Sequence, residues 1–130
     1  MIIYVESSAA AKLILEEPES DAMAAFLNGF ALAGHSVVAS TLVETELRRA
    51  ATRGGAPQSA ATETLSRLDI VDIERPTFTA AGLMPGQSLR SLDALHVATA
   101  LAILADIFVS YDERQIEAAE RAGFHVVSPA

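Results

Sequence analysis

Residues 2–8 read Ile-Ile-Tyr-Val-Glu-Ser-Ser, a short apolar run that is closed by an acid and two serines. The β-branched and aromatic residues of the run predict a buried strand. A serine is a favoured helix cap, so we expect a helix to follow through about Leu15. A strand that leads directly into a helix is the repeating unit of α/β proteins.

The same alternation continues along the chain. Pro18 suits the first position of a second helix, and Gly34 closes that helix. The remaining helices are expected at residues 41–52, after Pro57, at 89–104 and at 112–121. The remaining strands are expected at residues 36–39, 68–73, 107–109 and 124–127, with a loop at 82–88. We therefore predict one α/β domain over residues 1–130, with a mostly parallel sheet covered by helices on both faces.

The composition limits the possible functions. The chain has 130 residues, 51% of them hydrophobic, and a mean hydropathy of +0.31, which is enough for a core without disulfides. It contains no cysteine, which excludes thiol catalysis and cysteine-based zinc sites. The net charge of −8 favours a bound cation or a basic partner over nonspecific binding to nucleic acid. With no basic leader and no apolar run of about 20 residues, we expect a soluble, cytoplasmic protein without a membrane segment.

Four acids stand where ligands bind in a parallel sheet, just beyond the carboxyl ends of the strands. Glu6 follows the first strand, and Glu46 lies one turn into the helix after the second strand. Asp112 follows the fourth strand, and Asp93 lies in the first turns of the helix expected to be buried. Four carboxylates in one cleft would repel each other unless cations bind there, and their oxygens suit Mg²⁺.

Each acid also has an explanation that involves no chemistry. Asp112 begins a sequence that matches a capping box, and Asp93 could pair with Arg90 one turn before it. Glu46 could be a solvated helix residue. Glu6 could be an exposed loop acid, since it is too long to be a favoured cap. The spacing of the acids alone therefore makes a weak case.

Other polar residues near these positions are ambiguous. Thr41 and Glu44 match a second capping box, which would explain Glu44 without chemistry. His96 lies on the same helix face as Asp93, and we expect a buried, supporting histidine rather than a metal ligand. The arginines that could contact RNA or an acidic partner segment, or simply form solvated surface, are Arg48, Arg49, Arg53 and Arg90.

The stretches of sequence around the acids identify a family more specifically than the spacing of the acids does. The stretches are Ile-Tyr-Val-Glu-Ser-Ser-Ala (3–9), Glu-Leu-Arg-Arg-Ala (46–50), Leu-Arg-Ser-Leu-Asp-Ala-Leu-His (89–96) and Phe-Val-Ser-Tyr-Asp (108–112). In this order they resemble the PIN-domain ribonucleases, in particular the VapC toxins of bacterial toxin–antitoxin pairs. The resemblance covers the whole chain, and the block at 89–96 is its most specific part.

The resemblance implies a three-layer α/β/α sandwich and an endoribonuclease that hydrolyses phosphodiester bonds with Mg²⁺ or Mn²⁺. The positions that match the family's catalytic acids are Glu6, Glu46, Asp93 and Asp112. All of them except Glu46 are expected to bind the metal. Ser7 and Ser110 match the small polar residues beside the first and the last acid. The implied partners are an RNA substrate, a VapB-type antitoxin and a second copy of the chain in a homodimer.

One position departs from the family pattern. The first acid is nearly always aspartate in the family, and here it is Glu6, which places the carboxylate one methylene further from the backbone. Because Mg²⁺ demands near-ideal octahedral geometry, this shift could weaken the placement of the metal. Two alternatives stay open: a PIN module that binds RNA or an antitoxin without efficient cleavage, and a PIN nuclease of RNA processing or repair.

Overall fold

The strands of the sheet all run parallel to one another. The computed structural model describes residues 1–130. Its strands are β1 (Ile2–Val5), β2 (Ser36–Ser40), β3 (Asp69–Val71), β4 (Ile107–Val109) and β5 (His125–Val127). They lie in the order β3-β2-β1-β4-β5, and every neighbouring pair is parallel. The apolar run at the start of the sequence therefore forms the central strand, which explains why it is almost wholly apolar.

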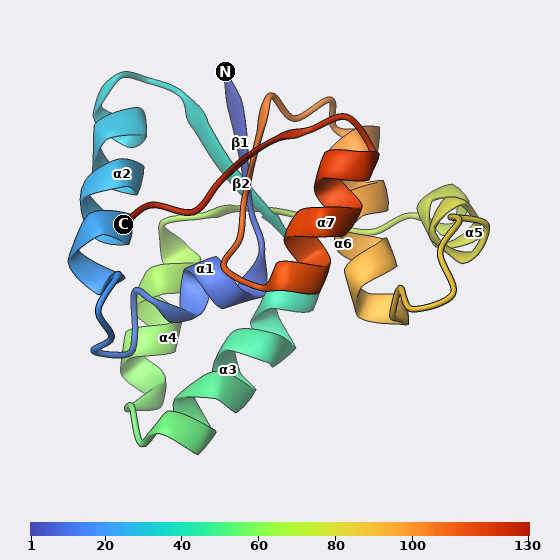
Figure 1. The fold of residues 1–130 in the computed structure, drawn as a ribbon. Coiled ribbons are helices and arrows are strands. Elements are labelled where there is room, and N and C mark those ends of the chain that lie inside the picture. The colour runs from blue at the N-terminus through green and yellow to red at the C-terminus, as the bar shows by residue number, and fades with distance from the viewer.

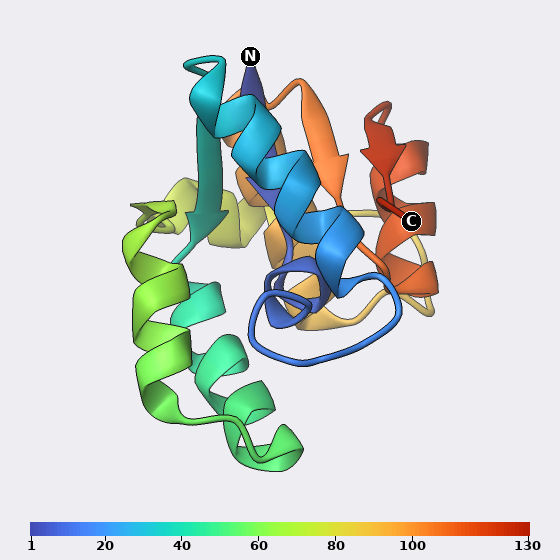
Figure 2. The ribbon, with the colours of Figure 1, turned by 90° about the vertical axis from the view of Figure 1, so that its left-hand side faces the viewer.

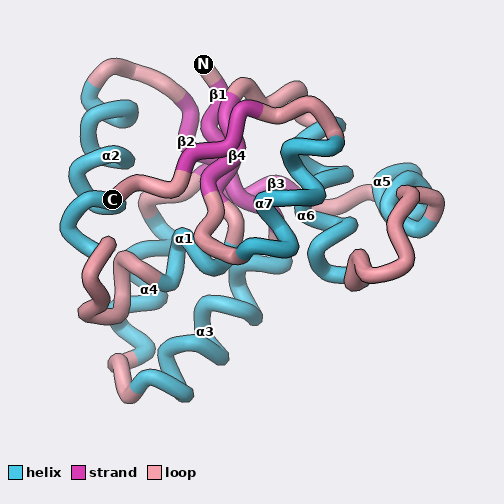
Figure 3. The backbone as a smooth tube through the Cα atoms, in the orientation of Figure 1, coloured by secondary structure: helices cyan, strands magenta, loops and turns pink.

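Helices cover both faces of the sheet (Figures 1 and 3). They are α1 (Ser7–Ala11), α2 (Ser20–Leu32), α3 (Leu42–Gly54), α4 (Gln58–Ser66), α5 (Arg75–Gly82), α6 (Ser91–Ala102) and α7 (Glu113–Arg121). Figure 2 shows α2 in front of the strands, while α6 and α7 lie on the opposite face. None of these helices has the length and apolar character that a membrane crossing requires.

Alternate side chains of β1 enter two separate cores, as the two-residue period of a strand requires. Ile3 and Val5 pack with apolar residues of α1, α2, α3 and α4. Tyr4 packs with Phe108 of β4 and with residues of α6 and α7. Two helical layers with a sheet between them confirm the predicted three-layer α/β/α architecture.

Some element boundaries differ from the prediction. The first helix ends at Ala11 and continues as turns, whereas we expected it to reach Leu15. The second helix begins at Ser20 rather than at Pro18, because the Ser20 hydroxyl donates to the carbonyl of Leu15 and accepts from the N–H of Glu17, which closes a turn before the helix. The third strand is confined to 69–71, and α5 was not predicted at all.

Two helix caps also differ from the prediction. Glu6, rather than a serine, caps α1: its backbone is extended and its carboxylate accepts from the N–H of Ser8 at 3.0 Å. Thr41 makes no capping bond at α3, where the hydroxyl of Ser40 accepts from the N–H of Leu42 instead. The capping-box explanation of Glu44 was therefore wrong, and the Glu44 carboxylate pairs with an arginine one turn later on α3.

Candidate active site

The strand order reverses between β1 and β4. The chain passes from β1 outward through β2 to β3, and then returns to place β4 on the other side of β1. Val5 and Val109, the last residues of these two strands, are register partners. The N–H of Glu6 extends the pairing by donating to the carbonyl of Val109 at 3.0 Å. This topological switch point is where open parallel sheets bind ligands, and Glu6 and Ser110 lie directly on it.

The Glu6 carboxylate is buried and turned toward neighbouring protein groups. Only 6% of the residue is exposed. One carboxylate oxygen accepts from the N–H of Ser8, and the other accepts from the hydroxyls of Ser8 and Ser110, the latter at 2.7 Å. Glu6 is therefore not the exposed loop acid that the sequence allowed. Its charge is stabilised by hydrogen bonds from both sides of the switch point.

Ser110 connects the first acid to the last one. While its hydroxyl donates to Glu6, the same oxygen accepts from the N–H of Asp112 at 3.1 Å. Asp112 caps α7, because its Oδ1 accepts from the N–H of Gln115 at 3.1 Å. The predicted capping role of Asp112 is confirmed. Its second carboxylate oxygen makes no hydrogen bond within the protein, and the residue is exposed, so one residue can cap the helix and also bind a ligand.

Asp93 and Asp112 repel one another. Asp93 lies in the first turn of α6 and is partly buried. Burial and the charge of Asp112 raise the pKa of Asp93, and the neighbouring Arg90 only partly opposes the rise. Gln115 joins the two positions, since its side-chain amide donates to the backbone carbonyl of Asp93 at 3.1 Å. The structure therefore brings these two predicted acids into one electrostatic pair.

Glu46 reaches the same region from α3. Its Oε1 accepts from the hydroxyl of Ser7 at 2.7 Å and contacts Nε2 of His96 at 2.7 Å. Burial alone would raise the pKa of Glu46, but the hydrogen bond from His96, the charge that His96 carries when protonated and the hydrogen bond from Ser7 outweigh burial, so the pKa is lowered. Glu46 is therefore not a freely solvated helix residue, and it stays anionic at neutral pH.

Sequence reasoning missed two residues that support the acids. Gln115 is 1% exposed, and its Oε1 is the buried side-chain atom left without a hydrogen-bond partner. Tyr4 is fully buried, and its hydroxyl lies 2.6 Å from Nδ1 of His96. Nothing local in the sequence marks Tyr4, because its partner lies on another element. Gln115 ends the sequence that matches a capping box, but the box does not form: the Gln115 amide binds Asp93, and the N–H of Asp112 donates to Ser110 instead. His96 is buried and bound to other side chains, which agrees with the supporting role expected for it.

The acids fit a hydrated hard cation better than a fully protein-bound one. No three histidine, aspartate or glutamate side chains are close enough to hold one metal between them. Mg²⁺ usually keeps several waters and needs only one or two carboxylates. Asp93 and Asp112 supply two carboxylates whose mutual repulsion such an ion would relieve. The carboxylate of Glu6 is occupied by Ser8 and Ser110, so its role as a metal ligand stays a prediction.

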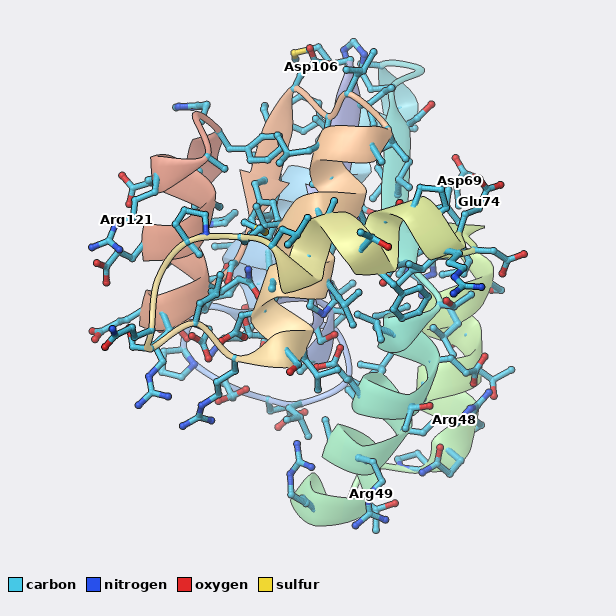
Figure 4. All side chains as sticks on the ribbon, turned by 90° about the vertical axis from the view of Figure 1, so that its right-hand side faces the viewer. Arg48, Arg49, Asp69, Glu74, Asp106 and Arg121 are labelled. Atoms are coloured by element: carbon cyan, nitrogen blue, oxygen red, sulfur yellow. The ribbon has the colours of Figure 1, made fainter.

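The arginines of α3 differ in their surroundings (Figure 4). Arg48 binds the side chain of Glu44 on α3 and the side chains of Gln58 and Thr62 on α4. It therefore holds these two helices together. Arg49 and Arg53 are exposed and make no ion pair or side-chain hydrogen bond. They are the α3 arginines that are free to contact RNA or a partner.

The acids do not line the cavities beside the loop between α5 and α6. Two cavities of about 370 Å³ lie around the loop between α5 and α6, and none of the four acids lines either of them. An open acidic site suits a long polymer better than a small molecule that must be enclosed.

Comparison with known proteins identifies the family. The sequence pattern of the PIN domain matches residues 3–121. The chain belongs to the PIN-domain family. Among its relatives, this PIN domain is 41% identical over 135 aligned residues to Ribonuclease VapC35 of Mycobacterium tuberculosis, covering 98% of this chain and 97% of the relative. It is 35% identical to Ribonuclease VapC46 of the same species, covering 98% of both chains.

Solved structures agree on the fold. Mycobacterium tuberculosis VapC20, described as a sarcin–ricin loop cleaving toxin, matches 98% of this PIN domain and 99% of its own chain with a TM-score of 0.77 and 17% identity. VapBC2 from Rickettsia felis, solved with a DNA fragment of its promoter, matches all of both chains with a TM-score of 0.75 and 20% identity. At these identities the likeness shows the fold alone.

Proposed function

We propose that this PIN domain is an endoribonuclease that hydrolyses RNA phosphodiester bonds with the help of Mg²⁺ or Mn²⁺. The observation that carries the proposal is the repulsive pair of Asp93 and Asp112 beside the switch point. Two carboxylates that repel each other in a partly buried site favour a bound cation. Two nearly full-length relatives are named ribonucleases, which supports the choice of RNA as the substrate.

In this proposal Asp93 and Asp112 would hold the ion, and Glu6 would complete the site if its carboxylate moved from Ser8. The ion, when bound, supplies positive charge that stabilises the negative charge developing at the phosphate. Glu46 stays ionised and offers Oε2, which has no partner within the protein, to orient water.

A serine nucleophile is a second mechanism that the contacts allow us to test. Ser7, His96 and Glu46 do lie together, with the Ser7 hydroxyl 3.4 Å from Nε2 of His96. In a hydrolytic triad, however, the serine and the acid bind opposite nitrogens of the imidazole. Here both contact Nε2, and the Ser7 hydroxyl donates to Glu46 at 2.7 Å. We therefore assign no nucleophilic role to Ser7.

Purified protein on defined RNAs, with Mg²⁺, Mn²⁺ or EDTA, tests the proposal. Asp93→Asn should abolish cleavage while the protein stays folded, because the amide keeps the shape and removes the charge. The matched control is Asp69→Asn, an exposed acid at the amino end of the edge strand β3, whereas the four acids follow the carboxyl ends of strands or lie on α3 and α6. Cleavage that survives both EDTA and Asp93→Asn would end the proposal.

One observation favours the weaker alternative, a PIN module that binds RNA or an antitoxin without cutting efficiently. The Glu6 carboxylate is already occupied by three hydrogen bonds from Ser8 and Ser110. Binding of labelled RNA by the wild type, without cleavage at any concentration of Mg²⁺ or Mn²⁺, would support this alternative. Efficient cleavage would exclude it.

We further propose that the protein acts in the cytoplasm as the toxin of a toxin–antitoxin pair, bound by a VapB-type antitoxin, and that it forms a homodimer. The structure named VapBC2 supports the pairing by analogy of fold. Expression of this chain alone should slow growth, and co-expression with an adjacent antitoxin gene should restore it. Lack of toxicity, even for Glu6→Asp, would favour a role in RNA processing or repair.

A further inference from the structure

A chain of buried hydrogen bonds reaches Glu46 from the interior of the protein. The hydroxyl of Tyr4, on β1, lies 2.6 Å from Nδ1 of His96, on α6. Nε2 of the same imidazole lies 2.7 Å from Oε1 of Glu46, on α3. Tyr4 is 0% exposed and His96 is 1% exposed, so neither exchanges partners with bulk water. Three elements from distant parts of the sequence are therefore joined through the two nitrogens of one imidazole.

The contacts of Nε2 require that this nitrogen carries a hydrogen. It faces a carboxylate oxygen of Glu46, which accepts hydrogen bonds only. It also lies 3.4 Å from the oxygen of Ser7, whose own hydrogen is donated to Glu46. A bare lone pair at Nε2 would repel both oxygens. The hydrogen of the imidazole therefore belongs at Nε2.

The contact at Nδ1 shows that this second nitrogen carries no hydrogen and accepts a hydrogen bond. The phenol of Tyr4 carries its proton at neutral pH, as an ordinary phenol with a pKa of about 10 does. A protonated hydroxyl 2.6 Å from Nδ1 donates to that nitrogen and leaves it as an acceptor. The hydrogen bond at one imidazole nitrogen sets which tautomer the other nitrogen presents.

We infer that His96 is a positioning residue: Tyr4 fixes its Nε2–H tautomer, and His96 in turn anchors Oε1 of Glu46 so that Oε2 is left for water or RNA. The inference rests on the proposed function, since Glu46 needs a fixed orientation only if the site performs chemistry. It gives Tyr4 a role in the reaction although the buried phenol contacts His96 and none of the acids.

Two substitutions of His96 test the roles of its two ring nitrogens separately. The side-chain amide of His96→Gln can place its N–H where Nε2 lies and donate to Glu46, whereas that of His96→Asn reaches only the position of Nδ1. We expect His96→Asn to lower kcat by about 10- to 100-fold, with little change in KM, as losses of supporting partners typically do. His96→Gln should recover most of that loss. The control is His125→Gln, the same change at an exposed histidine of β5, which should leave activity unchanged.

Tyr4→Phe tests whether the phenol acts through the histidine. It should lower kcat on its own, because the tautomer is no longer fixed. In the double variant with His96→Gln it should cause no further loss, since the imidazole through which it acts is absent. Additive losses, or a His96→Gln variant as inactive as a folded His96→Asn variant, would overturn the inference.

A measurement on the protein itself keeps the inference testable if a variant fails to fold. Long-range ¹H–¹⁵N NMR correlations of the wild type should show a neutral His96 ring with its proton on Nε2. A proton on Nδ1, or on both nitrogens at neutral pH, would overturn the inference whatever the activities are. If the wild type does not cleave RNA, the proposed function fails separately, while the spectrum still reports the tautomer.

Discussion

Glu6 and Ser110, 104 residues apart in the sequence, are joined by a hydrogen bond of 2.7 Å in which the serine hydroxyl donates to the carboxylate. The bond links the ends of β1 and β4. It also turns the longer carboxylate of Glu6 back onto the protein, where the N–H of Ser8 provides a second donor. In this structure the Glu6 carboxylate therefore caps α1 and binds Ser110 at the same time.

The first prediction concerns that methylene. Glu6→Asp should raise kcat/KM for RNA by about 10- to 100-fold, because a displacement of about 1 Å at a catalytic group can cost on the order of a hundredfold in rate. Charge is unchanged, so long-range electrostatics cannot produce the difference. Cleavage should be measured across a titration of Mg²⁺ and of Mn²⁺, where the glutamate form should need more Mg²⁺. Equal cleavage by both forms at every metal concentration would show that Glu6 is neutral.

The second prediction concerns the stability cost of Asp93. Its pKa is raised in the folded protein by burial and by Asp112, so the folded state binds the proton more tightly than the unfolded chain does. Stability must then fall as the pH rises through the interval between the unfolded and the folded pKa, and stay lower above it. In EDTA, Asp93→Asn should melt at or above the wild-type temperature at neutral pH.

The difference between the two proteins should disappear as the pH falls below the unfolded pKa of aspartate, where Asp93 is neutral in both states. Thermal unfolding over a series of pH values checks this, with Asp69→Asn as the control for loss of one exposed charge. An Asp93→Asn protein that melts below the wild type at neutral pH would contradict the assignment of Asp93 as a destabilising, function-linked acid.

The third prediction links metal to stability. Millimolar Mg²⁺ or Mn²⁺ should raise the melting temperature, because a ligand that binds only the folded state stabilises it. Asp112→Asn should lose this response and melt at or above the wild-type temperature without metal, since asparagine can still accept from the N–H of Gln115 as a helix cap and no longer repels Asp93. Asp112→Ala should lose both the response and the cap, with a loss of about 1 kcal/mol of stability from the missing cap.

Differential scanning fluorimetry with and without each ion separates these effects. Ca²⁺ could raise the melting temperature without supporting cleavage, because it is also a hard cation. If no divalent ion shifts the melting of the wild type, Asp93 and Asp112 do not form a metal site.

The fourth prediction separates the arginines of α3. Arg49→Ala combined with Arg53→Ala should weaken the binding of RNA or of the antitoxin and reduce its salt dependence, while the melting temperature stays close to that of the wild type. Arg48→Ala should instead lower the melting temperature and leave the binding of RNA or of the antitoxin unchanged, because Arg48 binds Gln58 and Thr62 on α4. Affinity at several salt concentrations, beside thermal unfolding, checks both. A double variant that binds with unchanged affinity and salt dependence would exclude Arg49 and Arg53 as contacts.

The alternation of strands and helices could be predicted because the hydrophobic pattern is strong where elements face the sheet. The central strand at Ile2–Val5 and the buried helix that contains Asp93 are such segments. The short helix Arg75–Gly82 could not be predicted in the same way. It packs chiefly against α6 and leaves Phe78 half exposed, so no apolar stripe marks it.

The positions of the acids followed from their places after strands, but their partners did not. The bond between Tyr4 and His96 spans 92 residues, and that between Ser7 and Glu46 spans 39, so no local pattern records either one. The cap formed by Glu6 was missed for a different reason. Glutamate is an uncommon capping residue, and only the extended backbone at Glu6 lets its carboxylate reach the N–H of Ser8.

The central place of β1 in the sheet has a consequence for synthesis on the ribosome. The first acid emerges almost at once, but β4, Asp93 and Asp112, which complete the switch point, belong to the last third of the chain. Because translation proceeds at about 5–20 residues per second, the proposed site remains unassembled for most of the time the protein takes to be made. A nascent or truncated chain would therefore be harmless to the RNA that encodes it, and activity would begin only once synthesis is nearly finished.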